Sequence, residues 1–422
     1  MIGIYAYLVA LFIRPQDFMP FMLGFPVVDY IAGFTLLIAF MRLIQQKRSI
    51  AAPQNYFIIL FLLVVFLSNI VNNNLNTAIE QFIVSLKRVA IFFMFFVILD
   101  SSQKLKWTIN FIVIAVVILA IQSIYQSIHG IGWAGQSLGG GDIVTRVNWI
   151  GLWDGPNVLC LLFVIVLPFT LEFAFGPYSA LWRLINLLFT ALLSCGIYLT
   201  NSRGGFFGFL AVLFFYFLTK FKNKKKAAIV GLFLGLIIIS SFASFGSFAP
   251  SRMGEIRGEA SAHERTWLWE QGLNLFREKP ILGIGKGQWR EVGHNNFVEY
   301  ITEMGLAGAF IYVSLIYLSF KALYIIQRLK PNDIKGDIII LPLLARALLI
   351  SMIGFNVVTF FVSMEHGILF VWLALCAVTL LIARQEIGNI SLKFSMKDAV
   401  AVLLIMVVIT AIIATLAIKN IV

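Results

Sequence analysis

The chain has 422 residues, of which 60% are hydrophobic and 12% are charged, and its formal net charge is +12. A soluble domain is about one quarter charged, so this composition excludes an ordinary soluble fold and indicates a chain solvated mainly by lipid. The largest basic cluster, residues 220–226, lies between two apolar runs. It therefore favours a topological anchor over a nucleic-acid site, and no nucleic-acid partner is expected.

Thirteen apolar segments follow one another along the chain, most of them near the roughly 20 residues needed to cross a bilayer. They run approximately over residues 2–13, 27–43, 56–71, 84–99, 107–128, 158–175, 181–199, 205–218, 227–245, 297–318, 338–361, 368–383 and 399–418. The first is short, so twelve spans are an alternative. It lacks a basic leader and a cleavage site, and we interpret it as a first helix, not a removed signal.

Each crossing segment must satisfy its own backbone hydrogen bonds, which favours helices. We therefore predict an all-α fold, a polytopic transmembrane helical bundle of 12 or 13 spans. No repeat and no long linker divides the sequence, so residues 1–422 are expected to form a single integral membrane domain.

The basic connecting segments all fall on one side when the spans are counted, and the positive-inside rule makes this side cytoplasmic. They contain Arg42, Lys47, Arg48, Lys104, Lys106, Arg183 and the basic residues of 220–226, 321–335 and 384–397. The opposite side then holds residues 14–26, 72–76, 129–157, 202–203, 248–293 and 363–366.

Residues 248–293 are the longest polar interruption and form one large outer loop. Within it, Ser261 to Lys279 is predicted to be an amphipathic helix along the membrane surface, with Ser261 as its cap and Pro280 at its exit. Glycines at 283, 285 and 287 follow. They could form a flexible turn that approaches a phosphate, although an ordinary loop is the preferred interpretation.

Ionisable residues at the ends of spans are functional candidates, because burying them in a membrane is costly. Arg203 precedes a predicted helix start, where its guanidinium, the Ser202 hydroxyl and free backbone N–H groups suit an anionic ligand. The alternative is an Arg that extends its charged end to the interface. Arg265 could supply a second guanidinium from the loop helix, or form a surface ion pair with Glu264 or Glu270.

His294 stands where the large loop re-enters the membrane. A neutral imidazole there could accept a proton from a hydroxyl group, since the ordinary pKa of histidine is about 6.5. A structural histidine is the alternative. Glu299 and Glu303 are four residues apart, so they share a helix face and could orient a partner or neutralise an arginine.

Two further sites are weaker candidates. Trp149 and Trp153 fit an interfacial aromatic belt, with a sugar-stacking surface as the alternative. Asp154 and Asn157 are predicted to cap the following span, and Asp154 is also a candidate substrate contact. Arg88 is expected near the outer end of its span, either binding an anion or extending to the interface.

No metal site is predicted. His129, His263 and His366 lack a metal-binding spacing, and the outer segments contain no Asp-x-Asp pair. Glu255 with Glu259 leaves a metal-assisted mechanism open as an alternative.

Three motifs, in this order, resemble the bacterial O-antigen ligase and polymerase family of membrane glycosyltransferases. They are Asn-Ser-Arg-Gly-Gly at 201–205, the outer loop with Arg265 followed by Pro-Ile-Leu-Gly-Ile-Gly at 280–285, and His294-Asn295 leading to Glu-Met-Gly-Leu-Ala-Gly at 303–308. Each motif is short. Their order, spacing and common side of the membrane make the combination specific over residues 154–308.

The resemblance implies inverting transfer of a glycan from undecaprenyl diphosphate to an acceptor hydroxyl, on the periplasmic face of the bacterial inner membrane and without a cofactor or metal. Arg203 and Arg265 would neutralise the diphosphate leaving group, and His294 would activate the acceptor as general base. The residues expected to bind substrate are Ser202, Arg88, Asp154, Asn157, Asn295, Glu299 and Glu303.

Within this family we expect a ligase that moves the glycan to the lipid A core. A polymerase that joins lipid-linked repeat units is the first alternative, and attachment of glycan to protein is another. A lipid-linked glycan transporter would also be polytopic. The charged candidates lie at one face of the membrane, however, and transporter sites usually lie near its midplane.

Overall fold

The computed structural model describes residues 1–46, 52–139, 145–220, 257–329, 340–364, 367–388 and 390–418. In this part of the chain the regular structure is helical, apart from two isolated β-bridges. Eleven described helices are long and apolar enough to cross a membrane, and α1 (Ile2–Phe12) is a shorter apolar helix. The prediction of an all-α polytopic fold is confirmed. The predicted segment 227–245 lies outside the described residues.

Contacts along the backbone divide the chain into two compact units. The first unit comprises Met1–Ile38, Ser101–Ile256 and Lys335–Val358, and the second comprises Ala39–Asp100, Arg257–Ile334 and Thr359–Val422. Each unit therefore combines segments that are far apart in the sequence. The single domain expected over residues 1–422 stays a prediction.

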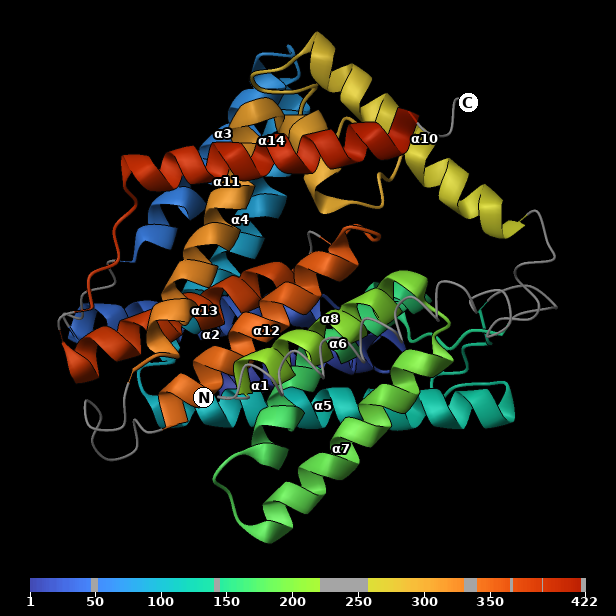
Figure 1. Ribbon diagram of the computed structural model, residues 1–422, viewed down its shortest axis with the longest axis vertical. Coiled ribbons are helices and arrows are strands. Elements are labelled where there is room, and N and C mark those ends of the chain that lie inside the picture. The colour runs from blue at the N-terminus through green and yellow to red at the C-terminus, as the bar shows by residue number, and fades with distance from the viewer. Residues whose placement is uncertain are drawn as a thin grey trace. The chain divides into compact units, whose positions relative to one another are not determined.

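The first unit is built around α6 (Pro156–Phe175), whose residues from Leu159 to Ala174 are all buried. Helix α6 packs against three neighbours, α5 (Ser102–His129), α7 (Ala180–Leu199) and α8 (Arg203–Lys220) (Figure 1). The unit also contains α1, the start of α2 (Val27–Gln46), and α12 (Leu341–Thr359) up to residue 358. A long apolar helix surrounded by other helices loses its contact with lipid and becomes the core.

Glycines allow α8 and α12 to approach closely. A Cβ atom added to Gly354 of α12 would lie 2.8 Å from a methyl group of Val212 of α8, and one added to Gly208 of α8 would overlap Val358. Small residues at such contacts are the usual means of packing membrane helices, because dispersion forces need short distances between them.

The second unit is centred on α11 (Asn296–Ile326), which packs against α3 (Pro53–Ile70), α13 (Gly367–Ile387) and α14 (Met396–Ile418). Helix α4 (Leu75–Ile98) lies beside α3 and α13. The loop helix α10 (Arg257–Glu278) lies against α11 and α14 (Figure 1). It is therefore packed on the helical core of its own unit.

Helix α10 is the amphipathic helix predicted within the outer loop, and it ends before Pro280 as expected. The predicted cap is wrong, because the helix begins at Arg257 and Ser261 lies inside it. Glu259 and Ala260 are good helix formers, so nothing stops the helix at the serine. Trp269 is buried and Trp267 is 52% exposed, which gives the helix one inner and one outer face.

Candidate functional site

His294 occupies a tight turn directly before α11. Its backbone φ of 50° lies in the left-handed region, which is uncommon for residues other than glycine. The preceding residue, Gly293, accepts a 2.8 Å hydrogen bond at its carbonyl oxygen from the indole Nε1 of Trp269 in α10. The imidazole is half-buried. The turn thus fixes His294 between the loop helix and the start of α11.

Arg265 lies on α10, one turn before Trp269, and its charge acts on His294. Burial is the main cause that lowers the pKa of His294 below its ordinary value, and the positive charge of Arg265 lowers it further. The negative charge of Glu264 has the opposite effect. A lowered pKa keeps the imidazole neutral at neutral pH, so one ring nitrogen can accept a proton. The structure therefore brings two of the three predicted catalytic residues together.

The other predicted residues at the start of α11 make contacts within the second unit. The Asn295 side chain caps α11 by accepting from the Val298 N–H at 3.2 Å, and it donates to the Phe360 carbonyl at 3.1 Å. Glu299 accepts a hydrogen bond from the Ser363 hydroxyl. Both predicted substrate-binding side chains therefore hold the segment after α12 against the start of α11.

Glu303 forms a buried ion pair with Lys286, with 2.5 Å between Oε2 and Nζ. The Gly287 N–H donates to the other carboxylate oxygen at 3.0 Å. The side chains of Glu303 and Lys286 are 8% and 7% exposed, so this pair is shielded from water. In this arrangement Glu303 neutralises a lysine of the outer loop.

The glycine series after α10 packs closely against neighbouring helices. Gly283, Gly285 and Gly287 all have positive φ angles, and a Cβ atom on Gly285 would lie 2.7 Å from Oδ1 of Asn69. The Gly285 N–H donates to the Glu303 carbonyl at 2.9 Å, close to a break in α11 at Gly305, whose φ is 62°. These glycines are used for turns and close contacts, which agrees with the preferred interpretation of an ordinary loop.

In the first unit, Arg203 is the first residue of α8 and is exposed. Ser202 caps the helix, because its hydroxyl oxygen accepts from the Gly205 N–H at 3.1 Å. A Cβ atom on Gly205 would overlap the thiol of Cys160, so the glycine lets α8 begin directly beside α6. The Asn-Ser-Arg-Gly-Gly motif thus places an arginine on the positive end of a helix dipole.

Arg146 lies beside this motif and was missed by the sequence analysis. Its Nε donates to the Thr200 carbonyl at 2.9 Å, and its Nη2 donates to Oδ1 of Asn157 at 2.8 Å. It joins the turn before α8 to the start of α6. The sequence offered one signal for it, since Arg146 is the only lysine, arginine or histidine in the segment between His129 and Asn157.

Two predictions about the start of α6 and the place of Arg88 are corrected. Asp154 and Asn157 do not cap α6, whose N-cap is Gly155 without a side-chain hydrogen bond. Instead, Asp154 accepts from Asn148 at 3.2 Å and Asn157 accepts from Arg146, because both face the preceding loop.

Arg88 lies near the middle of α4, since this helix begins at Leu75 and not at the predicted residue 84.

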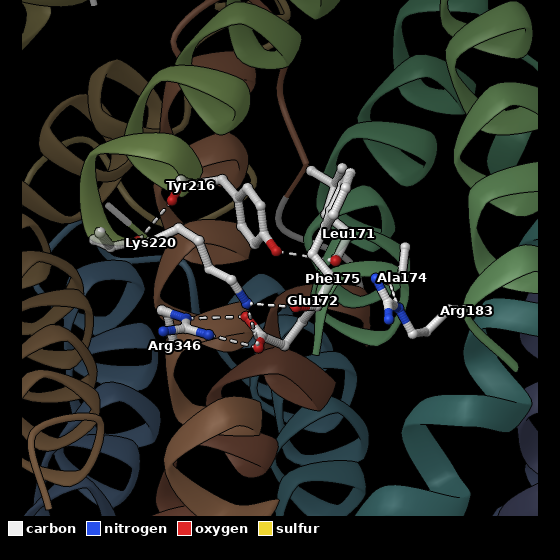
Figure 2. A network of polar contacts seen from close by, with 9 residues as sticks. Leu171, Glu172, Ala174, Phe175, Arg183, Tyr216, Lys220 and Arg346 are labelled. Atoms are coloured by element: carbon white, nitrogen blue, oxygen red, sulfur yellow. Dashed lines mark hydrogen bonds and ion pairs between the residues drawn. The ribbon is translucent and has the colours of Figure 1, made fainter. Parts of the chain in front are cut away.

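A second charged cluster lies at the opposite end of α6 (Figure 2). Glu172 is fully buried and forms a two-point ion pair with Arg346 of α12, at 2.9 and 2.5 Å. Lys220 lies 3.7 Å from the same carboxylate and donates to the Phe175 carbonyl at 2.9 Å. Arg183 donates to the Ala174 carbonyl. The cluster satisfies the last carbonyl groups of α6 and neutralises Glu172.

The three basic residues of this cluster also bear on the membrane topology of the chain. Arg183, Lys220 and Arg346 come from three different helices and meet at one end of α6, while Ser202 and Arg203 begin α8 toward the other end. Arg183 and Lys220 belong to segments that the charge pattern assigned to the cytoplasmic side, whereas Arg346 lies within the predicted span 338–361. Arg183 and Lys220 therefore lie at the same end of α6, and the side of the membrane that this end faces stays a prediction.

Within the described residues, no group of three or more His, Cys, Asp or Glu side chains is arranged to hold a metal ion. Glu255 lies outside the described residues, so the alternative that pairs it with Glu259 is not addressed by the structure.

The comparison with known families agrees with the sequence motifs. A family model described as O-antigen ligase matches residues 188–313, a region that contains Arg203, Arg265 and His294. A comparison with curated proteins gives no match. The matched region runs from α7 into α11 and includes all three motifs on which the resemblance rested. Over this region the chain is similar to the O-antigen ligase family, and its apolar helices are those of a multi-pass membrane protein.

Proposed function

We propose that the protein is an O-antigen ligase-like, inverting glycosyltransferase. It moves a glycan from undecaprenyl diphosphate to a hydroxyl group of the lipid A core, on the periplasmic face of the bacterial inner membrane. The observation that carries the proposal is the pairing of Arg265 with a half-buried, neutral His294 inside the region matched by the family. This pairing supplies an anion-binding group and a base next to each other.

His294 acts as the general base in this proposal. The acceptor hydroxyl oxygen attacks the anomeric carbon of the donor sugar, and a ring nitrogen of His294 takes the hydroxyl proton. The bond between the anomeric carbon and the diphosphate oxygen breaks as the new glycosidic bond forms. A positioned base of this kind contributes about 10²–10⁴ to the rate.

Arg265 stabilises the negative charge that grows on the departing diphosphate. A guanidinium held in place before the reaction costs no reorganisation at the transition state, and it presents paired N–H groups to phosphate oxygens. The same cation lowers the pKa of His294, so one residue assists both the leaving group and the base. Arg203, at the start of α8, is assigned to the diphosphate by the resemblance and by its helix-terminal position.

The residues around these groups are proposed to bind substrate or to hold the site in place. Their contacts in the structure divide them between these two roles. Ser202 and Arg88 remain candidates for binding the donor. Asn157, which contacts Arg146, and Asp154, which contacts Asn148, are further candidates. Asn295, Glu299 and Glu303 contribute by holding the turn at His294 and the outer loop.

A polymerase of lipid-linked repeats uses the same donor chemistry, so deletion of the gene is the test that separates the two functions. Loss of a ligase leaves full-length glycan on the lipid carrier and a bare lipid A core. Loss of a polymerase leaves core capped by a single repeat, which would overturn the choice of ligase. Lipid-linked donor trapped in the cytoplasmic leaflet would instead identify a transporter.

A further inference from the structure

Trp269 is a buried residue of α10 that contacts the turn at His294. Its side chain is 3% exposed, and its indole N–H donates to the Gly293 carbonyl at 2.8 Å. Its ring packs edge-on against Phe360, with 5.3 Å between the ring centroids. Phe360 in turn accepts at its carbonyl from the Asn295 side chain. The residues on both sides of His294 are thus held by one small group of contacts.

The backbone of His294 needs such support. A residue with a side chain in the left-handed region is strained and persists only where its surroundings hold it. The Trp269 bond fixes the carbonyl directly before His294, and the Asn295 cap fixes the residue directly after it. The direction of the imidazole therefore depends on these two hydrogen bonds.

Arg265 is tied to the same part of α10 as Trp269. The two residues are four apart on α10, so their side chains project from the same face of the helix. Close packing at Gly272, where a Cβ atom would lie 2.7 Å from Oγ1 of Thr302, holds this face against α11. Movement of Trp269 would separate Arg265 from His294.

From these contacts we infer that Trp269 is a positioning residue that holds the His294 imidazole beside the Arg265 guanidinium. The inference deepens the proposed function and rests on it for its effect on the rate. The arrangement itself can be measured without any turnover, because it determines how His294 titrates.

The chain offers matched variants for the test. Trp269→Phe keeps an aromatic ring beside Phe360 but removes the N–H donor. Phe360→Leu removes the ring contact but keeps the donor and the backbone carbonyl. Trp267→Phe makes the same chemical change on the exposed face of α10, and it serves as the control.

Two measurements on the full-length protein complete the experiment. The first is NMR titration of histidine in detergent-solubilised protein labelled on its imidazole rings, with the His294 signal assigned by its loss in His294→Ala. The second is the kinetics of transfer from an undecaprenyl-diphosphate-linked glycan. Trp269→Phe is expected to raise the His294 pKa toward 6.5, and to lower kcat by about tenfold to a hundredfold with little change in KM. Trp267→Phe and Phe360→Leu are expected to keep the wild-type pKa.

An unchanged His294 pKa in Trp269→Phe would overturn the inference. Equal increases in Trp269→Phe and Phe360→Leu would also overturn it, since they would assign the effect to general packing and not to the hydrogen bond. Full transfer activity of His294→Ala would overturn the proposed function instead, and the titration would still test the arrangement.

Discussion

Arg265 lies close enough to His294 for its positive charge to lower the pKa of the imidazole, and both residues belong to the second unit. The pair joins a loop helix to the turn at which the chain re-enters the helical bundle. A surface arginine and a structural histidine were the alternatives for these residues. The effect of Arg265 on the pKa of His294 is the basis of the proposal that the two residues act together.

The pH dependence of transfer should reflect this pair. Only neutral His294 can act as a base, so activity should rise with pH through the His294 pKa and be constant above it. Because that pKa lies below 6.5, the wild-type protein should remain active at mildly acidic pH. Arg265→Gln removes one of the two causes that lower the pKa, and should move the rising limb to higher pH.

Arg265→Gln should also reduce kcat by about 10² or more, as loss of a preorganised charge-stabilising group does. Arg277→Gln is the matched control, because Arg277 lies at the exposed far end of α10 and donates to Asn274. A pH profile of Arg265→Gln that coincides with the wild-type profile would contradict the coupling. Rates measured between pH 5 and 8 are sufficient.

Glu303→Gln tests whether Glu303 binds substrate or holds the outer loop. The change removes the carboxylate that pairs with Lys286 in a buried site, and loss of one partner of a buried ion pair typically costs about 3–5 kcal/mol. The thermal unfolding temperature should fall, and backbone amides of residues 280–287 should exchange hydrogen faster. Adding Lys286→Met to Glu303→Gln should recover most of the lost stability. Lost transfer activity with unchanged stability would assign Glu303 to the substrate.

How far the sequence predicted the fold can be judged from α10 and α4. The apolar runs identified the membrane helices, and Pro280 correctly marked the end of α10. Hydropathy missed the start of α4, because Leu75 to Ile83 includes polar residues that are still helical. Arg88 was therefore expected near the end of the helix, whereas it lies near its middle. Hydropathy reports contact with lipid and does not report where a helix begins.

The candidate site was predicted in part. The motifs pointed to Arg265 and His294, and in the structure the charge of Arg265 lowers the pKa of His294. Arg146 and the Lys286–Glu303 pair were not predicted, since their contacts depend on tertiary packing. Arg146 meets Thr200, 54 residues away, and the loop that carries Lys286 is held by Asn69, 217 residues away. No local pattern encodes such contacts, and family motifs report shared residues without their partners.

Glu172→Gln should destabilise the protein while leaving the chemistry unchanged. Within the described residues, it removes the carboxylate that pairs with Arg346 and Lys220. Glu172 itself is fully buried, and the side chains of Arg346 and Lys220 are 19% and 27% exposed. The free energy of unfolding should fall because Arg346 loses its carboxylate partner, and the loss should be smaller than the about 3–5 kcal/mol of a fully buried pair, since water reaches part of the guanidinium. Arg183→Gln is the control at the same end of α6, since Arg183 is exposed and should contribute much less.

Transfer by Glu172→Gln should keep its wild-type kcat and KM well below its unfolding temperature. Glu172 lies about 22 Å along α6 from Asn157, at a rise of 1.5 Å per residue. A large loss of kcat in a fully folded Glu172→Gln protein would show that the ionic cluster takes part in the reaction.

Removal of divalent cations should leave transfer unaffected. Arg203 and Arg265 are proposed to carry the charge compensation that a metal ion provides in other glycosyl transfers. Turnover measured in EDTA should therefore equal turnover measured with magnesium or manganese. Activity that disappears in EDTA and returns with either ion would refute the metal-independent mechanism.

The central claim is that His294 and Arg203 act in glycan transfer, and the purified protein tests it most directly. Transfer from undecaprenyl-diphosphate-linked glycan to lipid A core in liposomes should fall by about 10²–10⁴ in His294→Ala. A comparable loss is expected in Arg203→Ala. His129→Ala, which changes an exposed histidine stacked on Tyr125, should keep the wild-type rate. Wild-type transfer by correctly folded His294→Ala or Arg203→Ala protein would contradict the account.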